Sequence, residues 1–273
     1  MRNFFKKQIA IPQDHGSWVF ILSPLFVGIF AGTKFTPNTL FLSLAVMSAF
    51  MLRQPVVALV KSYSGRRPKT DLPAAIFWSL IYGSISALAL IEIILYGFVF
   101  ILYLIPPVVP IFLWHLWLVS QRNERKQAGV EIIATGVLSL AAPAAYWIGI
   151  GSYHPTGWWL WLLTWLQSAA SIVYAYLRLE QRDQLPDTSR SEQWKSGQRA
   201  LLYTSFNLLT SLILGWYKLI PPLIFAPFLI QWLETLWGIT HPAIKWKPMR
   251  IGMRQFLVSS LWTILFIIFW RTT

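Results

Sequence analysis

The stretch MLRQPVVALVKSYSGRRPKTDL, residues 51–72, separates two long apolar runs and carries five basic residues but a single acid, Asp71. Lys and Arg collect in the cytoplasmic loops of membrane proteins, so this stretch predicts both a membrane-embedded chain and its orientation. A second polar stretch, residues 174–199, lies between two later apolar runs. We expect the two stretches to meet on one membrane face and to form the mouth of a polar site.

The composition is typical of an integral membrane protein. Hydrophobic residues make up 56% of the 273 residues and charged residues 12%, and the mean hydropathy is +0.53. A soluble domain carries about 25% charged residues, so this chain has too few to solvate its surface. It has no cysteine, which excludes disulfides, thiolate catalysis and cysteine-based metal sites.

The apolar runs predict an all-α, polytopic membrane protein with a single transmembrane domain, residues 1–273. A spanning helix needs roughly 20 apolar residues, and nine runs approach this length: 15–33, 36–52, 73–93, 97–119, 128–150, 157–177, 200–217, 219–237 and 255–270. Prolines predict a kink in run 97–119 and an irregular start to run 219–237. Residues 183–198 are polar and are expected to form a flexible cytoplasmic loop.

Counting basic residues predicts the orientation. The N-terminal segment and the loops after the second, fourth, sixth and eighth runs carry 20 of the 23 Lys and Arg residues, whereas the other side carries Lys34, Lys218 and Arg271. Positive loops stay in the cytoplasm, so we expect a cytoplasmic N-terminus in a bacterial-type inner or plasma membrane. The net charge of +13 is explained in this way, and nothing favours nucleic acid as a partner.

The basic stretch is a candidate ligand-binding element, with Arg53, Lys61, Arg66 and Arg67 as the residues concerned. Arginine forks match phosphate oxygens in pairs, so these side chains could clamp a phosphate or diphosphate. The alternative is a loop that sets the topology and holds anionic lipid headgroups.

The sixth run carries a polar stripe. Gln167, Ser171, Tyr174 and Arg178 follow one another at spacings of four, three and four residues, which places them on one face of a helix. This face either lines a ligand-binding cavity or forms a hydrogen-bonded seam with neighbouring helices.

Two groups of residues could carry chemistry. Asp14 and His15 pair a carboxylate with an imidazole, and Glu131 is an ionisable residue near a span end, so these three are the candidate catalytic residues. Asp14 could instead cap a helix. The carboxylates of Glu180 and Asp183 are spaced to hold Mg²⁺ bridging a phosphate, although an ordinary mixed-charge loop has the same pattern.

The sequence resembles the YwiC-like family of bacterial membrane proteins. The segments that carry this resemblance are PQDHGSW at residues 12–18, RQP at 53–55, residues 122–131 and YAYLR at 174–178.

A more distant resemblance is to the UbiA superfamily of intramembrane prenyltransferases, which have nine helices and polar motifs after helices 2 and 6. Residues 172–183 look like the second Asp-rich motif of that superfamily, and Arg66-Arg67-Pro68 looks like its basic-proline element. The first Asp-rich motif has no match here. The resemblance implies a UbiA-like bundle and, for an enzyme, prenyl or lipid-phosphate transfer with Mg²⁺, but the carboxylates of the first motif are missing.

These observations predict a protein that binds an isoprenoid or lipid phosphate or diphosphate in a cytoplasm-facing intramembrane cavity, in the manner of a degenerate prenyltransferase. Membrane lipids are the expected partners. Two alternatives remain open, which are a small-solute transporter and a non-catalytic assembly subunit of a membrane complex.

Overall fold

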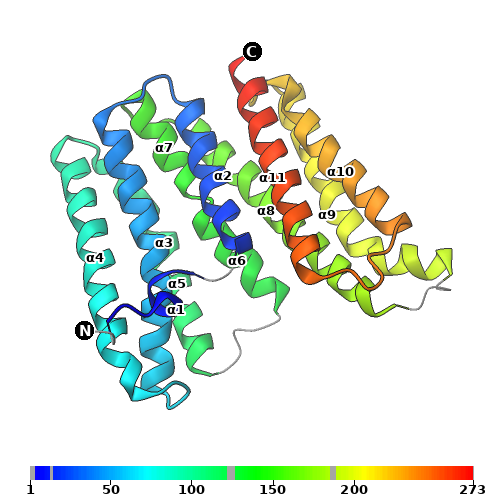
Figure 1. Cartoon of the computed structure of the whole chain (residues 1–273). Coiled ribbons are helices and arrows are strands. Elements are labelled where there is room, and N and C mark those ends of the chain that lie inside the picture. The colour runs from blue at the N-terminus through cyan, green and yellow to red at the C-terminus, as the bar shows by residue number, and fades with distance from the viewer. Residues whose placement is uncertain (1–3, 13–14, 122–126, 185–188, 273) are drawn as a thin grey trace.

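The apolar runs fold as helices, because a chain surrounded by lipid must satisfy its backbone polar groups internally. The computed structural model describes residues 4–12, 15–121, 127–184 and 189–272, in which no strand occurs. The long helices are arranged as a bundle (Figure 1). They are α2 (His15–Ala31), α3 (Pro37–Tyr63), α4 (Leu72–Leu95), α5 (Ile105–Ser120), α6 (Ala128–Leu138), α7 (Ala141–Ile150), α8 (Thr156–Glu180), α9 (Arg190–Trp216), α10 (Phe225–Thr240) and α11 (Pro248–Arg271).

Five short elements complete the chain. They are the helix α1 (Lys7–Ala10) and the 3₁₀ turns η1 (Lys69–Asp71), η2 (Val99–Leu104), η3 (Gln181–Asp183) and η4 (Pro222–Ile224).

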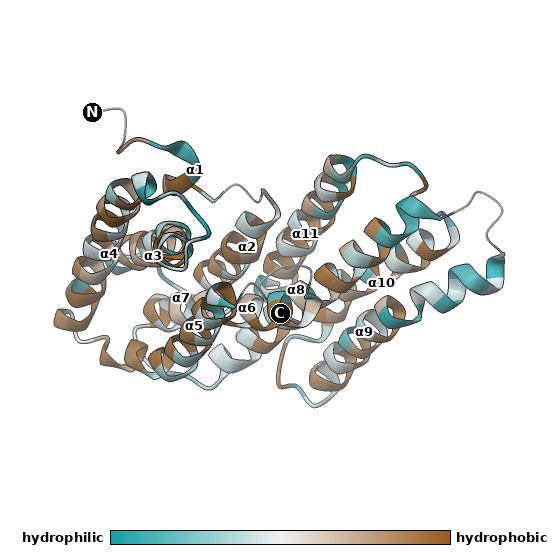
Figure 2. Cartoon of the chain, turned by 90° about the horizontal axis from the view of Figure 1, so that it is seen from below, coloured by the Kyte–Doolittle hydropathy of each residue, from teal (hydrophilic) through white to brown (hydrophobic). Residues whose placement is uncertain are grey.

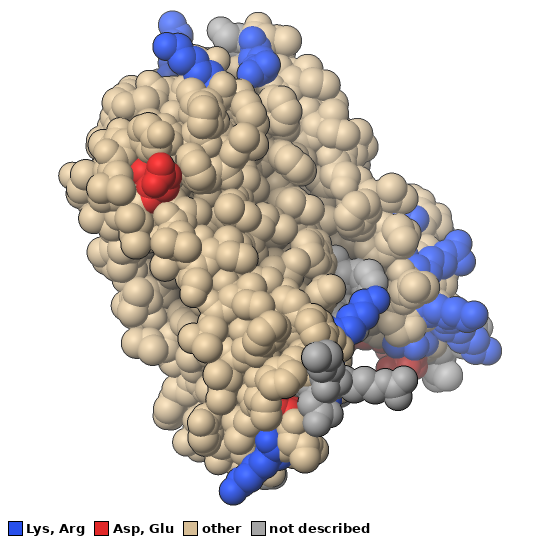
Figure 3. Space-filling model, turned by 60° about the vertical axis from the view of Figure 1, so that its left-hand side comes forward, with Lys and Arg blue, Asp and Glu red and all other residues tan. Residues whose placement is uncertain are grey.

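Most of these helices have the length and hydropathy of membrane spans, which confirms the predicted class. Among the described residues, seven stretches are long and apolar enough to cross a membrane: Pro37–Tyr63, Lys69–Leu95, Val99–Ser120, Ala128–Ile150, Thr156–Asp183, Pro222–Thr240 and Pro248–Arg271. The apolar helix Gly16–Ala31 is shorter. Figure 3 shows basic side chains at both ends of the molecule and a broad belt almost free of charge between them. The orientation in the membrane stays a prediction.

Two of the predicted runs that contain prolines begin with a 3₁₀ turn, while the kink in run 97–119 stays a prediction. The run 97–119 begins as η2 and continues as α5, whose first turn contains Pro106 and Pro107. The run 219–237 begins irregularly, since η4 precedes α10. The run 128–150 is also divided, into α6 and α7, because Pro143 lacks the amide hydrogen that a continuous helix needs at that position.

Small residues bring α2 and α7 into close contact. A Cβ atom on Gly28 would lie 2.8 Å from the Cβ of Ala145, and one on Gly32 would lie 3.0 Å from the Cα of Gly149. Such small residues four apart let membrane helices pack closely without a side chain between them. On another side α2 packs against α11, where the hydroxyls of Ser23 and Thr263 are 2.5 Å apart. Helix α2 therefore packs between α7 and α11.

The arrangement has two edges and a centre. Figure 2 shows α3 and α4 at one edge and α9 and α10 at the other, with α2, α6, α7, α8 and α11 between them. Helix α8 packs against α2, α6, α7, α9, α10 and α11. The described parts of the polar stretches 51–72 and 174–199 both lie at one end of the bundle (Figure 1), which we name the basic end because it holds most of the described Lys and Arg residues. The described residues do not bring them together into one mouth.

Helix α9 starts earlier than expected. Residues 190–198 were predicted as part of a flexible loop, but they form its first turns, and the expectation is wrong for them. Ser189 caps the helix: its amide donates to Glu192 Oε2 at 3.0 Å, and the Glu192 amide donates to Ser189 Oγ at 3.3 Å. Hydrogen bonds from Ser189 also hold the pKa of Glu192 below its usual value.

The contact between α2 and α7 predicts a stability effect. Gly28→Leu should lower the thermal midpoint of the detergent-purified protein, because overpacking a close contact costs about 1–3 kcal/mol. The matched control is Gly83→Leu on α4, where nothing lies within 4 Å of the added Cβ. The midpoints are measured by tryptophan fluorescence. Equal midpoints for the two variants would contradict the close packing.

Candidate functional site

The polar stripe of α8 is buried along its length. Gln167, Ser171, Tyr174 and Arg178 share one face, as their spacing predicted, and each is buried. In the first half of the stripe, Gln167 Nε2 donates to Ser259 Oγ on α11 at 3.1 Å. Gln231 Nε2 on α10 donates to Ser171 Oγ at 3.1 Å. Gln167 and Ser171 therefore form a hydrogen-bonded seam between three helices, which was one of the two alternatives.

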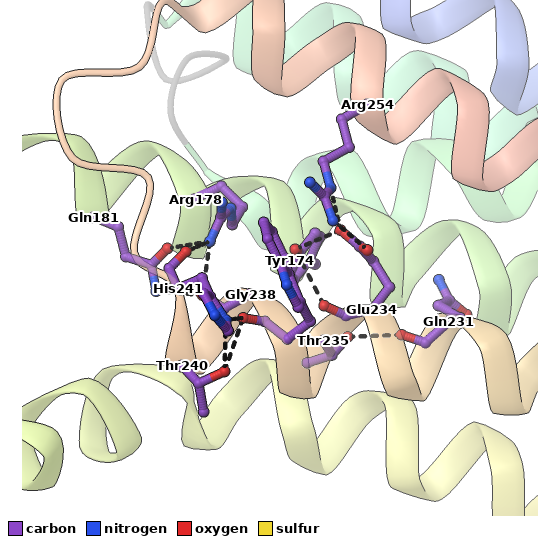
Figure 4. A network of polar contacts seen from close by, with 11 residues as sticks. Tyr174, Arg178, Gln181, Gln231, Glu234, Thr235, Gly238, Thr240, His241 and Arg254 are labelled. Carbon is purple, nitrogen blue, oxygen red and sulfur yellow. Dashed lines mark hydrogen bonds and ion pairs between the residues drawn. The ribbon is translucent and has the colours of Figure 1, made fainter.

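Towards the basic end, the seam becomes an ionic network (Figure 4). Tyr174 Oη donates to Glu234 Oε1 on α10 at 2.8 Å. Arg254 on α11 donates to the same carboxylate twice, from Nε at 2.6 Å and from Nη2 at 2.8 Å. Such a bidentate pair is the strong form of this interaction. The carboxylate of Glu234 is thus fully engaged.

Gly238 makes room for this network. A Cβ atom at this position would lie 2.6 Å from a ring carbon of Tyr174, so only glycine lets the phenol reach Glu234 past α10. Arg254 also lies over the Trp237 ring, with its guanidinium carbon 3.8 Å from the ring centroid. Close packing therefore fixes both partners of Glu234.

Arg178 caps the C-terminal end of α10. Its Nη1 donates to the carbonyls of Gly238 and His241, both at 2.7 Å, and to Gln181 Oε1 at 2.9 Å. A cation at the C-terminus of a helix bonds its free carbonyls and interacts favourably with its dipole. The arginine is 1% exposed, and its Nε and Nη2 have no hydrogen-bond partner among the residues that the structure describes.

Aromatic rings and further arginines surround this guanidinium. Its central carbon lies 5.0 Å from the ring centroid of Trp246, 5.5 Å from that of Trp237 and 5.9 Å from that of Tyr174. Arg250 stacks on the same Trp246 ring at 4.1 Å. Arginines 178, 182, 250 and 254 therefore gather around the end of α8, and we name them the arginine cluster.

The segment between α10 and α11 folds over the cluster. Arg182 Nε donates to the Trp246 carbonyl at 2.6 Å, and the amide of Ala243 donates to Gln181 Oε1 at 3.3 Å. The amide of Lys245 donates to the Arg182 carbonyl at 3.3 Å. Residues 241–247 therefore cover the end of α8.

The first basic stretch lies elsewhere and is held by the protein itself. Arg67 Nε and Lys6 Nζ contact the two carboxylate oxygens of the buried Asp71, at 2.6 and 2.5 Å. Arg66 Nη1 donates to the Val119 carbonyl at the end of α5. Arg53 and Lys61 lie on α3, which runs beyond the predicted span to Tyr63. The predicted ligand-binding residues thus fall into two groups, one on α3 and the turn after it at an edge of the bundle, and the other on α8 in its centre.

Of the three candidate catalytic residues, the structure describes only the side chain of Glu131. Asp14 lies outside the described residues, and so does the side chain of His15 at the start of α2. Glu131, in the first turn of α6, accepts a hydrogen bond from Tyr176 Oη at 2.9 Å and is exposed. This bond joins α6 to α8.

The candidate magnesium ligands are solvent-exposed. Glu180 and Asp183 lie at the end of α8, outside the buried network. Within the described ranges, no group of three or more His, Asp or Glu side chains is placed to hold a metal ion. Mg²⁺ takes several oxygen ligands, so the described donors at this end do not fit a magnesium site built by the protein alone.

Sequence reasoning missed the partners of the stripe. Gln231, Glu234, Thr235 and Gly238 follow one another at helical spacing on α10, so a polar and small-residue face was present in the sequence. Arg254 lies in the second turn of α11 and was taken only as a positive loop residue. The complementary stripe on α10 is the signal that could have identified the network.

Comparison with known proteins identifies the first half of the chain. Residues 11–146 match the model of the family described as YwiC-like protein. No curated protein and no solved structure matches the chain. The matched residues end before α8, so the arginine cluster lies outside them. The resemblance to the UbiA superfamily stays a prediction.

The ion pair predicts an asymmetric effect of two substitutions. Arg254→Met should destabilise the protein more than Glu234→Met, because it leaves a largely buried carboxylate without its cation. Removing one partner of a buried pair costs about 3–5 kcal/mol, and replacing both costs far less. The double variant should therefore unfold close to Glu234→Met in a thermal scan. Additive losses in the double variant would contradict the pairing.

Proposed function

Since the chain belongs to the YwiC-like family and has the helices of an integral membrane protein, we propose that it binds the phosphate or diphosphate of an isoprenoid or related lipid at the arginine cluster. The observation that carries the proposal is Arg178, a guanidinium that is 1% exposed and leaves two nitrogens unpartnered among the described residues. Burying a charge without compensation costs several kcal/mol. An anion at this place would supply the compensation.

The free edge of the guanidinium suits a phosphate. Nε and Nη2 lie side by side on one edge of the planar group, so two oxygens of one phosphate can accept from both at once. Lysine, with a single ammonium, cannot offer this geometry. The site therefore favours an oxyanion over a neutral ligand.

The charges around Arg178 favour an anion as well. The nearest carboxylate, Glu234, is already engaged by Arg254 and Tyr174. The three rings around Arg178 each contribute about 0.5–2 kcal/mol through cation–π contacts, which offsets only part of the cost of burial. Arg182 and Arg250 add further positive charge at the same place.

The surroundings favour a lipid over a free phosphate. Trp237 and Trp246 flank the cluster, and tryptophan is enriched at the depth of lipid headgroups. Leu233 and Trp237 are exposed on α10 and offer an apolar path along which an isoprenoid chain can lie. The positive-inside count predicts that this end of the bundle faces the cytoplasm.

The proposal concerns binding, and transfer chemistry is not part of it. A UbiA-like transfer would use carboxylate-held Mg²⁺ on the diphosphate. The described acids near Arg178 are Glu234, which is paired, and Glu180 and Asp183, which are exposed. We therefore assign no catalytic step to these residues.

The test is equilibrium binding of a radiolabelled prenyl diphosphate to the purified protein in nanodiscs. Arg178→Lys keeps the charge but loses the fork, so affinity should fall ten- to a hundred-fold, corresponding to about 1.5–3 kcal/mol. Arg199→Lys, an exposed arginine on α9, is the matched control and should bind as the wild type does.

Two further measurements separate binding from folding. The thermal midpoint of Arg178→Lys shows whether the cap on α10 survives, and the comparison is made only at temperatures where both proteins are folded. Prenyl alcohol, which has the same chain without the phosphate, should compete poorly. Wild-type affinity in a folded Arg178→Lys protein would refute the proposal, and so would equal competition by the alcohol.

A further inference from the structure

Two pockets open at the end of the bundle opposite the arginine cluster. The larger, of about 690 Å³, is lined mainly by apolar side chains between the end of α9, η4, α10 and the end of α11, among them Leu212, Trp216, Phe225 and Trp270. Thr156, the first residue of α8, also lines it, whereas Arg178 lies in the last turn of that helix. The two sites are therefore about one membrane thickness apart.

Basic residues gather at these pockets although they are rare at this end. Of the 23 Lys and Arg residues, the sequence places only Lys34, Lys218 and Arg271 on this side. Lys218 lines the larger pocket, and Lys34 and Arg271 line a smaller one of about 180 Å³. Cations on this side run against the positive-inside tendency. Their common position at pockets therefore points to an anionic ligand.

Lys218 is the cation that lines the larger pocket. Arg271 is engaged, since its Nε donates to the Phe30 carbonyl at 2.8 Å and its guanidinium lies over the Phe30 ring. The ammonium of Lys218 is exposed and makes no hydrogen bond or ion pair with the residues that the structure describes. The other residues that line this pocket are apolar apart from Thr156.

The backbone holds Lys218 in a conformation that favours glycine. Its φ is +56°, and its amide donates to the Gly215 carbonyl at 3.0 Å, where the chain turns from α9 into η4. The amide of Leu219 donates back to the Leu214 carbonyl at 3.0 Å, as in a helix end that normally carries glycine. A lysine at this position adds a charge to the pocket that glycine would lack.

We propose that the larger pocket binds an anionic phospholipid of the leaflet opposite the arginine cluster. The phosphate lies at Lys218, and an acyl chain lies against Leu212, Phe225 and Trp270. Charge complementarity selects an anionic headgroup, and the apolar lining selects a lipid over a free phosphate. Trp216 is 85% exposed beside the pocket, as expected for an aromatic anchor at headgroup depth.

The test is native mass spectrometry of the full chain released from nanodiscs that contain phosphatidylglycerol and phosphatidylcholine in equal amounts. The wild type should retain phosphatidylglycerol in preference to phosphatidylcholine. Lys218→Gly, which suits the backbone, should reduce this preference about fivefold, because one lysine near the headgroups contributes about that factor. Lys218→Arg should keep it.

The matched control is Lys195→Gln, which removes one charge from the exposed opposite end of the same helix and should leave the preference unchanged. An unchanged preference in Lys218→Gly would overturn the proposal. Equal loss in Lys195→Gln would overturn it too, because the preference would then reflect net charge alone. Glycerol phosphate, a headgroup without chains, should not displace the lipid, and displacement would identify a free-anion site instead.

Discussion

The charge of Arg178 is the constraint on which the second half of the bundle depends. Its Nη1 holds the last carbonyls of α10, and its neighbours Gln181 and Arg182 hold residues 241–247 in place. Arg178 and these two neighbours together therefore fix the end of α8, the end of α10 and the approach to α11. A cation buried to this extent needs more than carbonyls and rings around it. The uncompensated charge of Arg178 therefore links the packing of the helices to the proposed lipid phosphate.

Two kinds of contact hold the helices together, which are hydrogen bonds between polar side chains and close approaches at small residues. On one side of α8, Gln167, Ser171 and Gln231 join helices through hydrogen bonds, which in lipid have no water to compete with them. Between α2 and α7, Gly28 and Gly32 let the two helices approach closely. The result is a bundle whose charged groups lie at its two ends, with a separate candidate anion site at each.

The sequence predicted the helices well because hydropathy and proline act locally. It also predicted that Gln167, Ser171, Tyr174 and Arg178 share a face, since that follows from helical spacing alone. Spacing cannot tell a seam from a cavity, because the answer depends on Gln231, Ser259 and Arg254, which come from distant parts of the chain. The positions of the two polar stretches were likewise out of reach, since helix packing sets them. Ser189 and Glu192 have the spacing of a helix capping pair, which could have been recognised in the sequence but was overlooked.

A density map of the protein purified in mild detergent with its native lipids tests the central claim most directly. We expect non-protein density with a phosphate-sized head within hydrogen-bond distance of Arg178 Nε and Nη2, continuing as a chain along Leu233 and Trp237 on α10. The rings of Trp237 and Trp246 packed closed around Arg178, with no added density at its free edge, would contradict the account. The arginine would then serve only to hold α8, α10 and α11 together.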